Sequence, residues 1–122
     1  MNARWSSIPM LVTVFVAGQA FADMDLAKAS GCTACHKVEA KVVGPPWACV
    51  AKRYQGDKAS AKTTLIEKVK KGGKGNWTTG DWAYLTGEVP MPPYSPRVSD
   101  ENIAKMVDFV LGLDVGKCPP KG

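Results

Sequence analysis

The sequence lacks the signatures of several common classes of protein. It has no phosphate-binding glycine loop and no paired-carboxylate signature, which argues against nucleotide binding and acid–base hydrolysis. No internal repeat or low-complexity tract divides the 122 residues, so we expect one small domain. The apolar stretch at residues 8–17 is too short to span a bilayer comfortably. Histidine is almost absent, because His36 is the only one. A site that needs two imidazoles is therefore excluded.

The most informative feature present is a Cys-x-x-Cys-His run formed by Cys32, Cys35 and His36. This spacing is the attachment pattern of a c-type haem. Each thiol can add across a different vinyl group of one porphyrin, and the adjacent imidazole can then ligate the iron. The alternatives are a haem-free, thioredoxin-like dithiol, which belongs to a βαβ unit, and half of a zinc site, which needs more ligands. We expect one covalently bound haem c.

The second axial ligand must be another residue type, and methionine is the obvious candidate. Beyond residue 22 the chain contains Met24, Met91 and Met106. Met24 falls in a short predicted helix and Met106 in a helical apolar stripe, so we expect both side chains to pack. Met91 lies in the proline-rich segment 88–96, where fixed φ angles and missing amide donors favour a preset loop. We therefore predict Met91 as the distal ligand.

Residues 1–22 have the pattern of a secretory signal peptide. Arg4 lies near the start, the apolar stretch follows, and Ala20-Phe21-Ala22 has the form of a cleavage site. Cleavage after Ala22 would leave a domain of residues 23–122 in the periplasm, and export suits a haem that is attached after translocation. The alternative is an uncleaved N-terminal anchor.

The periodicity of residues 23–122 predicts an all-α domain, with four short helices and long loops around the haem. We expect helices at residues 23–29, 47–55 and 60–71, and a last helix capped by Ser99. The segment 72–96 is typical of a loop. The last helix would bury an apolar stripe made of Ile103, Met106, Val107 and Val110.

In order along the chain, these landmarks resemble the small bacterial class I cytochromes c, particularly the soluble monohaem proteins that donate electrons to nitrite reductase. The matching segments are 27–36, 43–45, 69–77 and 89–93. The resemblance implies a class I cytochrome c fold. It also implies a monomeric electron carrier that is not an enzyme and shuttles single electrons between respiratory redox partners.

The same resemblance implies roles at individual positions. Cys32 and Cys35 would form the thioethers, with His36 as the proximal and Met91 as the distal iron ligand. Pro45 would accept a hydrogen bond from the other imidazole nitrogen, which fixes the ring and raises its basicity.

The resemblance also implies roles at the rim of the haem site, where this chain differs from the family pattern in two ways. Trp77 would direct its indole N–H at a haem propionate and Lys68 would lie near the same group; the alternatives are a core tryptophan and a solvated lysine. Residues 78–88 are additional to the shortest family members, and Trp82 among them is an alternative to Trp77. Tyr94 stands where some relatives have an asparagine that hydrogen-bonds the axial methionine.

Two cysteines remain once the haem pair is assigned. In an oxidising compartment, Cys49 and Cys118 suggest one structural disulfide. The alternative is two unrelated thiols.

The net charge of +5 indicates the kind of partner. Beside an exposed haem edge, lysines would steer a redox partner with an acidic docking face, in fast and salt-sensitive encounters. Export and the haem motif argue against nucleic acid, and we expect no stable membrane insertion. The basic residues of the middle third are Lys52, Arg53, Lys58, Lys62, Lys68, Lys70, Lys71 and Lys74.

One other function stays open. If Met91 dissociated readily, the iron could bind a diatomic gas or reduce peroxide. The chain has no distal histidine for that chemistry, which leaves Arg53, Tyr84 and Arg97 as candidates.

Overall fold

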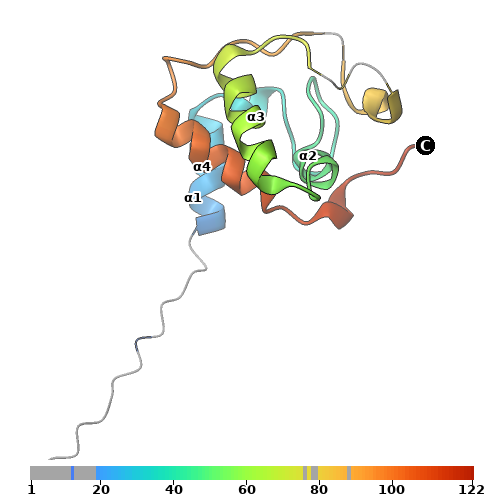
Figure 1. Cartoon of the computed structure of the whole chain (residues 1–122), viewed down its shortest axis with the longest axis horizontal. Coiled ribbons are helices and arrows are strands. Elements are labelled where there is room, and N and C mark those ends of the chain that lie inside the picture. The colour runs from blue at the N-terminus through green and yellow to red at the C-terminus, as the bar shows by residue number, and fades with distance from the viewer. Residues whose placement is uncertain (1–11, 13–18, 76, 78–79, 88) are drawn as a thin grey trace, which may run out of the picture.

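A computed structural model of the chain describes residues 12, 19–75, 77, 80–87 and 89–122, and side chains from residue 23 onward in the first helix (Figure 1). Most of the predicted signal peptide, together with residues 76, 78, 79 and 88, therefore lies outside the described residues. The described part confirms the all-α prediction, because it consists of helices and loops without a named strand. Its elements are α1 (Gln19–Ala29), η1 (Cys32–Ala34), α2 (Trp47–Arg53), α3 (Lys58–Lys71), η2 (Gly80–Leu85), α4 (Asp100–Leu111) and η3 (Val115–Lys117), where η denotes a 3₁₀-helix.

Local side-chain caps set the helix starts. Ser99 caps α4 as predicted, because its hydroxyl oxygen accepts a 3.2 Å hydrogen bond from the backbone N–H of Asn102. For α3 the predicted start was two residues late, since Asp57 caps the helix by accepting a 3.1 Å hydrogen bond from the Ser60 N–H. Helix α1 begins at Gln19 rather than residue 23, and α2 ends at Arg53 rather than residue 55.

The segment 72–96 is less irregular than the sequence indicated, because it contains η2. Periodicity did not reveal this short helix, since a 3₁₀ turn of this length carries too little pattern.

Helix α4 organises the core by packing against α1, α2 and α3 (Figure 1). Its predicted apolar stripe is buried, with Ile103 at 1% exposure, and Met106 packs in the core as expected. The packing prediction for Met24 was wrong, because this side chain is 36% exposed. Within the described residues, no helix combines the length and apolar character that a membrane span requires.

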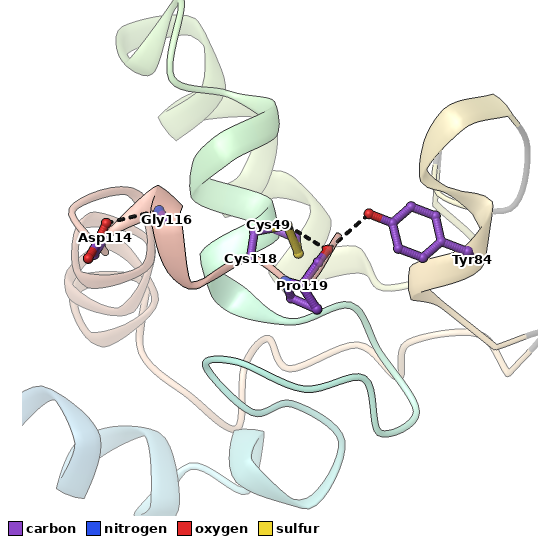
Figure 2. Close-up of a disulfide and its surroundings, with 6 residues drawn as sticks. All are labelled: Cys49, Tyr84, Asp114, Gly116, Cys118 and Pro119. Carbon is purple, nitrogen blue, oxygen red and sulfur yellow. Dashed lines mark hydrogen bonds between the residues drawn. A yellow bond between two sulfur atoms is a disulfide. The ribbon is translucent and has the colours of Figure 1, made fainter. Parts of the chain in front are cut away.

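The predicted disulfide between Cys49 and Cys118 is present and joins α2 to the segment that follows η3 (Figure 2). The hydroxyl of Tyr84 in η2 donates a 3.1 Å hydrogen bond to the carbonyl of the adjacent Pro119. The Cys118 sulfur also lies 3.7 Å from that carbonyl oxygen, but a disulfide sulfur carries no hydrogen to donate. The C-terminal segment is thus attached to both α2 and η2.

Candidate functional site

A largely apolar cavity brings together the residues that the sequence singled out. Its walls come from the motif around η1, the loop before α2, the inner faces of α3 and α4, and the segment that follows η2. The predicted site residues that line it are Cys32, Cys35, His36, Pro45, Lys68, Trp77 and Met91. Every member of the predicted set therefore borders one cavity.

His36 is held by the loop that follows it. Its Nδ1 lies 2.9 Å from the carbonyl oxygen of Pro45, the hydrogen bond that the resemblance implied. A carbonyl can only accept, so the proton lies on Nδ1 and the lone pair on Nε2. Desolvation lowers the pKa of His36, while the Pro45 hydrogen bond opposes that effect. The imidazole is therefore neutral at pH 7, the form in which it ligates metals.

The same loop is closed by backbone hydrogen bonds to the motif. The carbonyl of Cys35 accepts from the N–H of Val43 at 3.3 Å and from that of Gly44 at 2.8 Å. Trp47, the first residue of α2, stacks on the imidazole of His36 with ring centroids 5.6 Å apart and planes at 17°. Sequence reasoning missed this contact, since only the fold places the start of α2 beside the motif.

Gly44 permits the close approach of the imidazole. A Cβ at this position would lie 2.8 Å from both ring nitrogens of His36 and closer still to the carbon between them. We expect Gly44→Ala to displace the ring, weaken the Pro45 hydrogen bond and destabilise the protein by about 1–3 kcal/mol, the usual cost of overpacking. Thermal unfolding and the visible spectrum of the haem protein would measure both effects. Gly56→Ala is the matched control, because no neighbour lies within 4 Å of a Cβ there; equal behaviour of the two variants would contradict the prediction.

Met91 is positioned by the end of α3. Its segment forms an isolated bridge with Gly73, in which Gly73 N–H donates to Met91 O at 2.7 Å and Met91 N–H donates to Gly73 O at 3.3 Å. The N–H of Tyr94 then donates to the last-turn carbonyl of Val69 at 3.1 Å. The segment thus satisfies carbonyls that a helix end leaves unpaired. Gly72 adopts φ +67° at this junction, where a side chain would meet the Met91 and Pro92 backbone.

Trp77 forms another wall and is 8% exposed. The guanidinium of Arg53 lies 4.7 Å from the centroid of its ring, and Trp82 packs edge-on at 5.5 Å. Lys68 reaches the same region, where its ammonium donates a 2.8 Å hydrogen bond to the carbonyl of Lys74. Trp82 supports Trp77 and does not line the cavity itself. Arg53 contacts Trp77 without lining the cavity. The sequence gave it as a basic residue of the middle third and as a candidate for gas or peroxide chemistry, and did not indicate this contact.

Tyr94, which stands where some relatives have an asparagine, is buried. It is 6% exposed and lines the cavity. The guanidinium of Arg97 lies over its ring, 4.9 Å from the ring centroid. Burial is the main cause that raises the pKa of this phenol. The phenol of Tyr94 is therefore protonated at neutral pH, and its ring forms an apolar part of the cavity wall.

The chemistry of this cavity fits a covalently held haem c. Both thiols of the motif are free, Cys49 and Cys118 being bonded to each other, and the imidazole offers a neutral Nε2. Most of the lining side chains are apolar, as a porphyrin requires. A zinc site fits less well, because the described residues contain no group of three or more histidine, cysteine or acidic side chains placed to hold a metal ion. The helical fold also removes the βαβ context that a thioredoxin-like dithiol needs.

Comparison with known proteins agrees with this geometry. The profile of the cytochrome c family matches residues 16–114. The chain is 47% identical to cytochrome c-551 of Allochromatium vinosum, over 80% of this chain and 93% of that protein. It is 41% identical to cytochrome c-552 of Nitrosomonas europaea, over 93% of this chain and 99% of that protein. The crystal structure of Nitrosomonas europaea cytochrome c552 superposes with a TM-score of 0.59, covering 72% of this chain and 95% of that one at 42% identity. The chain therefore belongs to the cytochrome c family, as a small class I member that carries electrons on one covalently attached haem.

Proposed function

We propose that this protein is a periplasmic electron shuttle whose haem is attached to Cys32 and Cys35 and ligated by His36 and Met91. The observation that carries the proposal is the shared cavity, which brings the imidazole and the two free thiols of the motif together with Met91, a residue far from them in the sequence. A c-type haem supplies a reversible one-electron couple, whose potential a methionine ligand raises.

Contacts within the protein restrict the positions of both proposed ligands, His36 and Met91. The Pro45 carbonyl fixes the tautomer of His36, and Trp47 stacked on the ring limits its rotation. The bridge with Gly73 fixes the backbone of Met91. With His36 and Met91 both bound to it, the iron of a haem held here would have no open position for a substrate, which suits electron transfer and opposes bond-making chemistry.

Basic and hydrogen-bonding residues define one end of the cavity. We assign Trp77 and Lys68 to the haem propionates, because both line the cavity and a Cβ at Gly75 would approach both, at 3.4 Å from Trp77 Cδ1 and 3.5 Å from Lys68 Cε. The Arg53 guanidinium over the Trp77 ring adds positive charge at this end. A cluster of cations of this kind would partly neutralise the propionate charge.

Two features of the sequence support the proposed location and partners. The signal-peptide pattern of residues 1–22, with cleavage near Ala22, supports export to the periplasm, where we infer that the protein acts as a monomer. Lysines near the cavity, such as Lys74, would steer an acidic redox partner in salt-sensitive encounters.

The absorption spectrum of the purified protein tests the ligand assignment. We expect the oxidised form to show the weak near-infrared band that accompanies methionine coordination to ferric iron. The reduced form should bind carbon monoxide poorly, because Met91 occupies the sixth position. Absence of the band together with ready carbon monoxide binding would overturn the shuttle in favour of gas binding or peroxide reduction.

A further inference from the structure

The disulfide-bonded C-terminal segment is coupled to the cavity although it does not line it. Cys118 is joined to Cys49 of α2, and the next residue, Pro119, accepts the hydrogen bond from Tyr84 (Figure 2). Neither Cys118 nor Pro119 is among the described residues that form the cavity walls. One connection to the cavity runs through α2, whose Trp47 and Val50 line it, and another runs through η2, which carries Tyr84.

Other residues of η2 pack against the core that supports the cavity wall. Trp82 packs edge-on against Trp77 at 5.5 Å, and Leu85, 2% exposed, is buried in the same core cluster as Trp77 and the disulfide. Immediately after η2, Thr86 and Gly87 line the cavity, and the Gly87 N–H donates a 3.1 Å hydrogen bond to the carbonyl of Val43. A displacement of η2 would therefore move both Trp82 and part of the wall.

Arg53 and Trp82 both contact the ring of Trp77. Arg53 lies over that ring at 4.7 Å, and Trp82 forms a T-shaped pair with it at a centroid distance of 5.5 Å. Arg53 belongs to α2, which also carries Cys49, whereas Trp82 belongs to the short η2 turn. A 3₁₀ turn of six residues has few internal hydrogen bonds, so its position relies on outside contacts. The Tyr84–Pro119 hydrogen bond is such a contact.

We propose that the Tyr84–Pro119 hydrogen bond makes the disulfide-bonded C-terminal segment a positioning element for Trp77. The disulfide fixes the position of Pro119 relative to α2. The hydrogen bond from Tyr84 to Pro119 then fixes the position of η2, and η2 in turn keeps Trp82 in contact with Trp77. Tyr84 and Pro119 are positioning residues that act through Trp82. The inference rests on the proposed function, in which Trp77 binds a haem propionate.

The test is Tyr84→Phe in the complete haem protein, which removes one hydroxyl and keeps the ring and the disulfide. We expect amide hydrogen exchange in residues 80–87 to become about fivefold faster, because a local contact that holds η2 is lost. A less firmly held Trp77 neutralises the propionate charge less well, which favours ferric iron. The equilibrium constant for reduction should therefore fall about threefold, which is roughly 30 mV because a tenfold change is 59 mV for one electron.

Lys117→Gln is the matched control. It breaks the 3.3 Å ion pair between Lys117 and Glu39, another contact of the C-terminal segment that does not involve η2. We expect wild-type exchange in residues 80–87 and a wild-type potential. A purely structural contact at Tyr84 would lower thermal stability without moving the potential.

Three results would overturn the proposal, and they are distinguishable. Unchanged exchange in residues 80–87 of Tyr84→Phe would show that Pro119 does not hold η2. Faster exchange with an unchanged potential, when Trp77→Phe does shift the potential, would show that η2 does not position Trp77. An unchanged potential in Trp77→Phe itself would remove the proposed role of Trp77, and this inference with it.

Discussion

Replacing Met91 with alanine is expected to abolish the near-infrared band of the oxidised protein and to let the reduced protein bind carbon monoxide. The alanine side chain carries no sulfur, so the sixth position becomes open to water or gas. Loss of the methionine ligand should also lower the reduction potential by on the order of 0.1 V, a fraction of the roughly 0.8 V over which axial ligands tune such centres. Spectra and a redox titration of the variant measure all three effects.

Met106→Leu is the control for this experiment. Met106 also borders the cavity but is buried in α4, with an exposure of 6%. A leucine conserves volume and apolar character, so the band and potential should remain close to those of the wild type. If the band survived in Met91→Ala and disappeared in Met106→Leu, the ligand assignment would be wrong.

Removing the disulfide with Cys49→Ala and Cys118→Ala together is expected to cause a large loss of stability. The bond closes a loop with a sequence separation of 69, and closing a loop of that size stabilises by about 4 kcal/mol in the chain-entropy model. The melting temperature should fall by roughly 15–30 °C for a domain of this size. We choose alanine because serine, the usual replacement for cysteine, would place unpaired hydroxyls at two buried positions.

Mass spectrometry provides the control for the disulfide. The unfolded wild-type protein, alkylated without prior reduction, should gain no label at Cys49 or Cys118. A loss of stability below about 1 kcal/mol in the double variant would show that the crosslink contributes little beyond packing.

The sequence by itself determined the features that depend on residues close together in the chain. The cofactor follows from Cys32, Cys35 and His36. These residues lie within five consecutive positions, so no tertiary contact is needed to define the motif. The capping of α4 by Ser99 and its buried stripe follow from local hydrogen bonding and helical periodicity. The η2 helix and the exposure of Met24 were missed, since a six-residue turn and the packing of one side chain leave little local signal.

The tertiary structure alone decided what surrounds the site. Trp47 on His36 and Arg53 on Trp77 are contacts between side chains that no sequence spacing brings together. The bridge from Gly73 to Met91 and the contact from Pro119 to Tyr84 likewise join segments that are distant along the chain. These contacts form only when α2, α3 and α4 pack around one cavity, because burial of their apolar faces fixes where the loops between them can run.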